Sequence, residues 1–145
     1  MSTNWKRREG SMDKWKIVPG KSIGKIEFGM DRENCRALLG DNYEEFKKSE
    51  FSTNTTDDYG FLHVFYTEDN QVEAVEVFEN TELVIDNTTV FPIQTSRIAE
   101  ALPGISEDEW GFTDEERSIG YETDGENATS ILVGCDGYYR IDEED

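Results

Sequence analysis

The sequence predicts an α+β fold, with a mainly antiparallel sheet of about five to seven strands and two helices packed on one side. Short runs rich in aromatic and β-branched residues, each bounded by turn residues, recur along most of the chain and indicate strands. Only two segments are expected to be helical, and they do not alternate one for one with the strands. A parallel βαβ sheet needs that alternation, so antiparallel pairing is favoured.

Strands are predicted where aromatic and β-branched residues cluster. In chain order these segments are residues 15–18, a short strand within 23–28, 61–66, 72–78, 83–85, 88–91, 117–122, 130–133 and 138–141. Residues 43–51 fit either a helical turn or an irregular strand, and the polar residues 52–60 are expected to form a loop.

The two helices are expected over residues 32–39 and 92–102. Asp31 is a typical N-cap residue for the first helix, and Gly40 is a typical residue just past its end. Apolar residues at positions i, i+3 and i+4 give this helix one apolar face. The second helix is expected to end at Pro103, because proline cannot continue a helix.

The length of 145 residues predicts one domain. Hydrophobic residues make up only 35 % of the chain, but aromatic residues make up 12 % and can fill a core. We expect a single α+β domain over residues 13–141, a basic and disordered N-terminal extension over residues 1–12, and an acidic tail over residues 142–145.

The strongest compositional signal is the charge, with 33 Asp and Glu against 14 Lys and Arg and a net charge of −19. Such a surface repels nucleic acid and anionic membranes, and it accelerates the encounter with a basic protein. The alternative is that the charge only keeps the protein soluble. No segment approaches the roughly 18 apolar residues of a membrane span, and residues 1–16 lack the apolar core of a signal peptide. A cytoplasmic location is therefore expected.

Catalytic and metal-binding residues are scarce in this sequence. His63, the only histidine, lies within a predicted strand, where a packed or edge histidine is the ordinary interpretation. A nucleophile–base couple with Cys35 or Cys135 is the alternative, although nothing in the sequence brings these residues together. There is no C-x-x-C motif and no zinc-ligand spacing. We therefore expect no enzymatic activity, no metal and no cofactor.

The acidic segment 107–116 is the most distinctive candidate for a binding site. Its carboxylates can pair with Lys and Arg of a partner, and its tryptophan can serve as an apolar anchor. The predicted partner-binding residues are Glu107, Asp108, Glu109, Trp110, Asp114, Glu115 and Glu116. The alternative is a solvated loop whose Trp110 and Phe112 turn into the core. A second acidic group, at Glu73, Glu76, Glu79 and Glu82, has the solvent-facing side of a sheet as its ordinary interpretation.

Residues 21–40 combine a glycine-marked strand, Phe28-Gly29-Met30, and a short capped helix that ends in Leu38-Leu39-Gly40. This opening resembles bacterial immunity proteins that bind and block secreted or contact-dependent toxins, the closest being those of wall-associated toxins that cut tRNA. A similar pattern occurs in small outer-membrane assembly lipoproteins, whose signal peptide and lipid-bearing cysteine are not found here.

The resemblance implies a protein that neutralises a basic nuclease toxin by covering its active site or nucleic-acid-binding site. Two other functions stay open at this point: a small hydrolase that depends on carboxylates, and a regulatory protein-binding module without a toxin partner.

Overall fold

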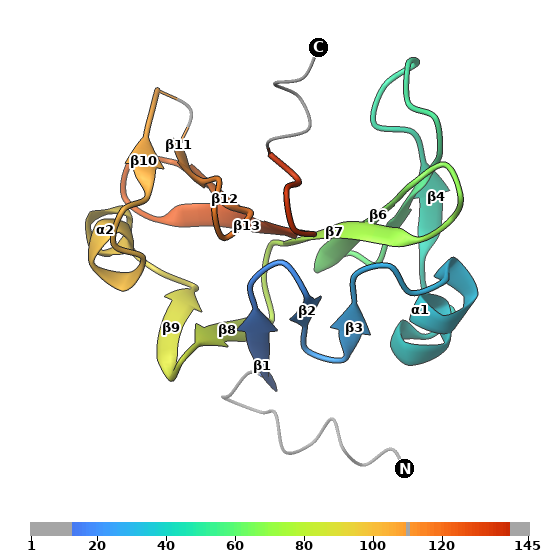
Figure 1. Ribbon diagram of the computed structural model, residues 1–145, viewed down its shortest axis with the longest axis horizontal. Coiled ribbons are helices and arrows are strands. Elements are labelled where there is room, and N and C mark those ends of the chain that lie inside the picture. Colours follow the sequence, from blue (N-terminus) through green and yellow to red (C-terminus); the bar gives the residue numbers. More distant parts are fainter. Residues whose placement is uncertain (1–12, 110, 140–145) are drawn as a thin grey trace.

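The computed structural model describes residues 13–109 and 111–139 (Figure 1). Within them the strands are β1 (Asp13–Val18), β2 (Ser22–Ile23), β3 (Ile26–Glu27), β4 (Glu44–Phe46), β5 (Thr56–Asp58), β6 (Leu62–Tyr66), β7 (Val72–Val77), β8 (Thr81–Ile85), β9 (Thr88–Phe91), β10 (Ser106–Glu107), β11 (Gly111–Asp114), β12 (Ile119–Thr123) and β13 (Ala128–Gly134). The helices are α1 (Arg32–Leu39), the 3₁₀ helix η2 (Thr95–Arg97) and α2 (Ile98–Ala101).

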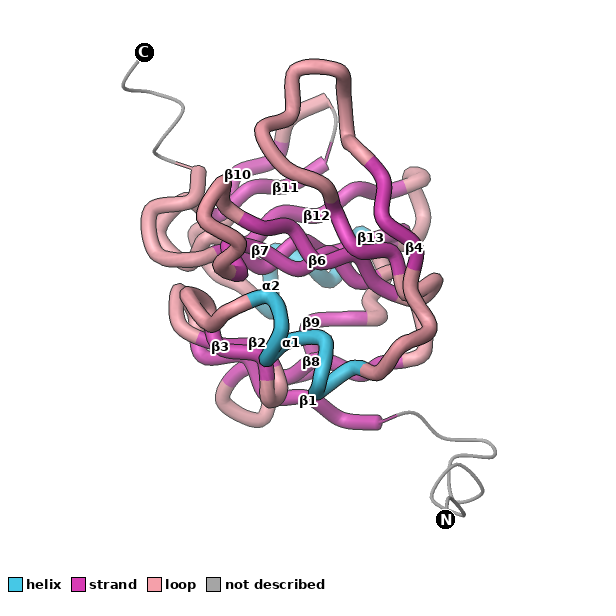
Figure 2. Tube along the Cα trace, turned by 90° about the vertical axis from the view of Figure 1, so that its right-hand side faces the viewer, coloured by secondary structure: helices cyan, strands magenta, loops and turns pink. Residues whose placement is uncertain are grey.

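The strands form two sheets that lie one above the other (Figures 1 and 2). The five-stranded sheet has the order β3-β2-β1-β8-β9, and the eight-stranded sheet has the order β10-β11-β12-β13-β7-β6-β5-β4. The strand pairs are antiparallel except for β1 and β8, which run parallel. The N-terminal strand therefore lies in the middle of the smaller sheet.

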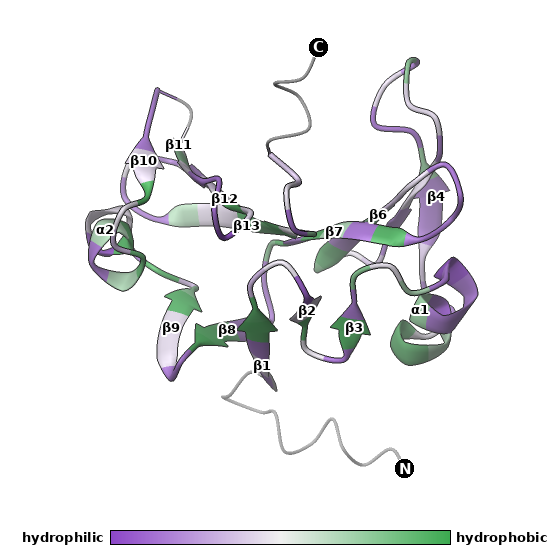
Figure 3. Ribbon diagram, in the orientation of Figure 1, coloured by the Kyte–Doolittle hydropathy of each residue, from purple (hydrophilic) through white to green (hydrophobic). Residues whose placement is uncertain are grey.

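The hydrophobic core fills the space between the two sheets. Val64, Val75 and Val133 form a row across the larger sheet, and each is fully buried. From the smaller sheet, Ile23 and Leu83 are equally buried in the same core. Because side chains alternate between the two faces of a strand, the other face of the larger sheet points away from the core. Figure 3 shows the hydrophobic residues that β1, β2, β3 and β8 of the smaller sheet carry.

The two helical segments lie at opposite ends of the molecule (Figure 1). Helix α1 has the predicted bounds, with Asp31 at its N-cap in an extended conformation and Gly40 at its C-cap with a φ of 99°. That positive φ is readily adopted by glycine and explains why the helix ends there. Among the described residues, no helix is long and apolar enough to cross a membrane.

The predicted α+β class and the mainly antiparallel pairing are confirmed, but the strand number was wrong. The described residues hold 13 strands in two sheets, where one sheet of about five to seven was expected. One added strand, β5, lies inside the predicted loop 52–60 and pairs with β6. Its buried Thr56 and Asp57 are polar, so hydrophobicity alone does not reveal it.

Two other predicted elements were also wrong in part. The helix expected over residues 92–102 begins only at Thr95, because the carbonyl of Ile93 accepts a hydrogen bond from the amide of Ala128. Residues 138 and 139, expected in a last strand, belong to a turn. The predicted extension 1–12 and the predicted acidic tail 142–145 lie outside the described residues.

Candidate functional site

The predicted acidic segment forms an arm that projects from the larger sheet on the side away from the core (Figures 1 and 2). This hairpin arm comprises β10, residues 108 and 109, and β11, and Glu107 pairs with Phe112 across it. Glu107, Asp108 and Glu109 are all exposed, and their contact with a partner stays a prediction. Trp110 lies outside the described residues, so its role as an anchor stays a prediction.

The hairpin arm is held in shape by specific backbone contacts. The Asp108 carboxylate accepts a hydrogen bond from the amide of Gly111 at 2.9 Å, and the amide of Asp108 donates to the carbonyl of Gly111 at 2.8 Å. A Cβ atom at Gly111 would lie 2.0 Å from the carbonyl oxygen of Tyr121, so only glycine fits there. Asp108 is therefore a structural residue of the arm as well as an exposed carboxylate.

The other predicted carboxylates, at residues 114–116, differ in their exposure to solvent. Glu115 and Glu116 are exposed, but Asp114 is buried. The Asp114 carboxylate accepts hydrogen bonds from the backbone amide of Arg117 and from its guanidinium. Asp114 therefore stabilises the turn between β11 and β12, and the prediction that its side chain contacts a partner loses its basis.

A groove of about 570 Å³ lies beside the hairpin arm. Its lining residues are Pro103, Gly104, Ser106, Asp108, Thr113, Asp114, Glu115, Glu116 and Arg117. Four of these side chains are carboxylates and one is a guanidinium. The structure thus brings most of the predicted acidic residues together around one concave, negatively charged surface.

The outer face of the larger sheet, turned away from the core, carries a row of mixed residues across six strands. The row consists of Thr113, Gly120, Leu132, Glu76, His63 and Asp58. Tyr138 and Tyr139 cover the two glycines on this face: a Cβ at Gly134 would lie 2.6 Å from Cγ of Tyr138, and one at Gly120 would lie 2.1 Å from the hydroxyl of Tyr139. The missing side chains thus make room for the two tyrosines.

The second predicted acidic group does not form a uniform solvent-facing surface. Glu76 is partly buried, accepts a hydrogen bond from the Ser130 hydroxyl at 2.9 Å, and has its pKa raised by burial. Glu82, on the smaller sheet, accepts a hydrogen bond from Thr89 at 2.6 Å. Glu79 is exposed between β7 and β8.

An aromatic cluster occupies the β4 end of the outer face. The ring of His63 packs edge-on against Phe46, Phe65 and Phe78, with centroids 5.1, 6.4 and 4.7 Å away. Its Nε2 lies 3.4 Å from the Asp58 carboxylate. The buried Cys35 lies on the other side of this sheet, among the core residues. These contacts favour the prediction that His63 is a packed histidine over the alternative that it forms a nucleophile–base couple with Cys35.

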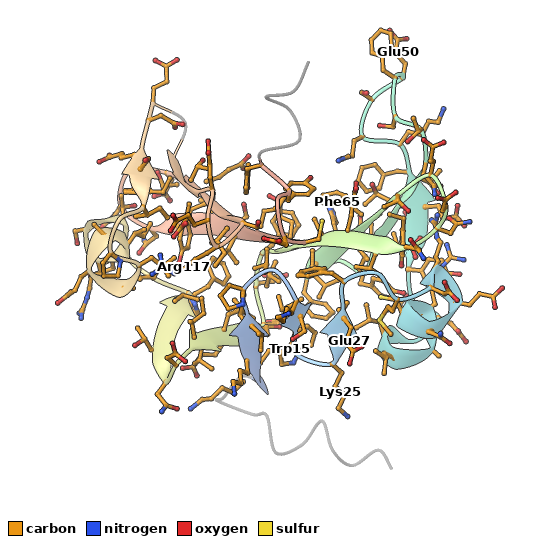
Figure 4. The ribbon with its side chains drawn as sticks, viewed as in Figure 1. Trp15, Lys25, Glu27, Glu50, Phe65 and Arg117 are labelled. Carbon is orange, nitrogen blue, oxygen red and sulfur yellow. The ribbon has the colours of Figure 1, made fainter. Side chains whose placement is uncertain are left out.

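A second arm projects from the same side of the larger sheet as the hairpin arm (Figure 1). This loop arm comprises residues 47–55, and Glu50 marks its tip in Figure 4. Phe51, next to the tip, is 84 % exposed and is the most exposed large hydrophobic residue described. At the inner side of the arm, the ammonium of Lys48 lies 4.2 Å from the centre of the Phe65 ring.

The base of the loop arm joins a buried ion network that the sequence analysis missed. Asp57 has no exposed surface, and its carboxylate accepts hydrogen bonds from Arg32 at 2.9 Å, from Arg36 at 2.8 Å and from the Tyr66 hydroxyl at 3.0 Å. Burial raises the pKa of Asp57, but these hydrogen bonds outweigh burial and hold the pKa below its usual value. The guanidinium of Arg32 also lies over the Tyr66 ring, 4.2 Å from its centre.

The same arginine connects this network to the loop arm. Arg32 donates to Asn54 at 3.0 Å and to Thr55 at 2.7 Å. The Asn54 amide donates in turn to the carbonyl of Thr67 at 2.8 Å, and Thr55 donates to Glu45 at 3.0 Å. Helix α1 therefore fixes the place where the loop arm leaves the sheet.

Among the described residues, no group of three or more His, Cys, Asp or Glu side chains is arranged to hold a metal ion. Comparison with known proteins adds no further assignment: no family model, no curated protein and no solved structure matches this chain. The two arms, the groove and the outer face between them are therefore the features from which a function can be argued.

Proposed function

We propose that this chain is an immunity protein that binds a basic nuclease toxin and covers its active site or nucleic-acid-binding site. The proposal is supported above all by the exposed carboxylates of the hairpin arm, Glu107, Asp108 and Glu109. They stand next to a groove that is lined by Asp108 and by three more acidic residues. The net charge of −19 also favours the approach of a basic protein.

Binding by occlusion follows from the chemistry of nucleases. An enzyme that cleaves RNA or DNA carries Lys and Arg side chains that bind phosphates. Carboxylates on a projecting arm can form charge-assisted hydrogen bonds with those same side chains, so the acidic protein competes directly with the nucleic acid. Such a protein needs no catalytic residue, metal or cofactor of its own.

The experiment starts from the neighbouring gene, which on this proposal encodes a protein that ends in a nuclease domain. We expect the two purified proteins to form a complex in which cleavage of RNA or DNA is inhibited at equimolar concentration. Absence of both binding and inhibition would reject the proposal.

A charge-reversal variant locates the contact. The double variant Glu107→Lys/Glu109→Lys leaves Asp108 in place, because Asp108 holds the hairpin arm together. Its association with the nuclease domain should be about tenfold slower at low salt, since local charges steer the encounter. The matched control is Glu27→Lys/Asp41→Lys, which changes the net charge equally at two other exposed positions. Figure 4 shows Glu27 on the side of the molecule opposite Glu50.

Equal association rates for the two double variants would show that only total charge matters and that the hairpin arm makes no specific contact. Circular dichroism and thermal unfolding of each variant establish that it is folded before its rates are compared.

A further inference from the structure

One aromatic side chain of the loop arm, that of Phe51, is almost fully exposed to solvent. Phe51 is 84 % exposed, whereas the other exposed large hydrophobic residues described, Val18, Leu38 and Phe46, are between 36 % and 45 % exposed. An isolated exposed apolar residue is common on protein surfaces. Phe51 differs because it stands beside the tip of an arm that projects from the same side as the acidic hairpin arm (Figures 1 and 4).

The turn that carries Phe51 is fixed by its own hydrogen bonds. The amide of Phe51 donates to the Ser49 hydroxyl at 3.1 Å, and the amide of Ser49 donates to the Ser52 hydroxyl at 3.2 Å. The amide of Ser52 donates to the carbonyl of Ser49 at 3.1 Å. The backbone thus holds Phe51 at the surface in a defined turn.

The base of the arm is fixed as well, by the buried ion network. Arg32 holds Asn54 and Thr55 while it also binds the fully buried Asp57. Because the backbone of the arm is ordered before any partner arrives, binding through Phe51 loses little conformational entropy. Preorganised aromatic residues of this kind are typical of the few side chains that dominate the affinity of an interface.

The surroundings of the loop arm indicate which kind of partner fits. A pocket of about 260 Å³ lies between the arm and the sheet, and Lys48, Phe65 and Glu73 are among its lining residues. Next to it, the outer face carries the aromatic cluster around His63, with carboxylates at Asp58 and Glu76. Apart from Lys48, these aromatic and acidic groups complement a basic protein surface that contains an apolar recess.

We propose that the loop arm is a second contact site, in which Phe51 inserts into an apolar recess of the nuclease domain while the hairpin arm pairs with its basic residues. This inference rests on the proposed function. The partner would lie across the outer face of the larger sheet, between the two arms.

The test measures binding of the same adjacent nuclease domain to Phe51→Ser. Loss of an anchoring aromatic residue should weaken affinity by about 30-fold, mainly through faster dissociation. Because Phe51 is so exposed, its replacement should leave the thermal unfolding temperature within about 2 °C of the wild type. Leu38→Ser is the matched control, since Leu38 is 45 % exposed on helix α1, and its affinity should stay within about twofold of the wild type.

A second variant, Phe51→Trp, keeps a large aromatic ring and should retain more affinity than Phe51→Ser. If the wild type binds the nuclease domain and Phe51→Ser dissociates from it at the wild-type rate, this inference is overturned but the proposed function stays intact. Equal losses in Phe51→Ser and Leu38→Ser would also overturn it. Absence of binding by the wild type would instead reject the proposed function and this inference with it.

Discussion

At the scale of single residues, the carboxylate of Asp57 is the most constrained charge described. It is fully buried and accepts hydrogen bonds from two arginines and one tyrosine. Burying an ion pair contributes little by itself, but removing one partner leaves the other charges buried and uncompensated.

The variant Asp57→Asn keeps the size of the side chain and removes its negative charge. We expect the free energy of unfolding to fall by about 3–5 kcal/mol, because Arg32 and Arg36 lose their common counter-ion. Urea denaturation monitored by tryptophan fluorescence measures the change. The control is Glu45→Gln, whose half-exposed carboxylate pairs with Arg36 at 3.0 Å and should contribute about 1 kcal/mol or less. Similar losses in both variants would contradict the dominant role of Asp57.

Glu76 should make stability depend on pH in the opposite direction to Asp57. Burial raises the folded-state pKa of Glu76 above its ordinary value of 4.5, so the folded protein holds this proton more tightly than the unfolded chain does. Stability should therefore decrease as pH rises through the folded-state pKa of Glu76. For Asp57, whose folded-state pKa is lowered, stability is present above its ordinary pKa of 3.8 and is lost below it.

The variant Glu76→Gln separates these two effects. It should show a smaller loss of unfolding free energy than the wild type as the pH rises above 4.5, while its stability still falls in acid. The readout is the urea midpoint at each pH. Glu79→Gln, at an exposed position between β7 and β8, is the control and should follow the wild-type curve. Parallel curves for the wild type and Glu76→Gln would show that Glu76 does not titrate in this range.

The exposure of Glu107, Asp108 and Glu109 could be predicted from the sequence, because a run of carboxylates avoids burial. The burial of Asp57 could not. The two arginines that compensate its charge come from α1, 25 and 21 residues earlier in the sequence. A Thr-Asp-Asp segment also has the composition of a turn, so no local signal distinguished the buried carboxylate from its exposed neighbours.

At the scale of elements, prediction succeeded where local signals agreed. Helix α1 had a capping residue at each end and one apolar face, and its bounds were correct. Prediction failed at the polar strand β5, which pairs with its neighbours β4 and β6. It also failed at residues 92–94, where Gln94 forms a bridge with the distant Asn127. Tertiary contacts override local propensity in such segments, because pairing satisfies backbone groups that a polar loop would leave to water.

At the scale of the whole molecule, the two-sheet arrangement was not accessible from the sequence. The strand β1 pairs in parallel with β8, which begins at residue 81. A pairing between segments so far apart leaves no periodic signal near either strand. The excess of carboxylates, by contrast, was evident from composition, and it determines how the molecule should approach a partner.

The net charge of −19 predicts a strong salt dependence of association with a basic nuclease domain. The association rate should fall steeply as ionic strength rises, because the screening length shortens from about 10 Å at 0.1 M to about 3 Å at 1 M. The dissociation rate should change much less, since close contacts such as the proposed insertion of Phe51 are less screened. Stopped-flow measurements over a series of salt concentrations give both rates. An association rate that does not change with salt would contradict electrostatic steering.

The packing of Tyr138 and Tyr139 over Gly134 and Gly120 has a practical consequence for any assay of this protein. The described chain ends on the outer face, between the two arms (Figure 1). A purification tag, fluorophore or immobilisation handle joined directly after Tyr139 would therefore start from the surface that the partner is proposed to occupy. Surface-coupled measurements should use an attachment through the N-terminus, because β1 belongs to the opposite sheet.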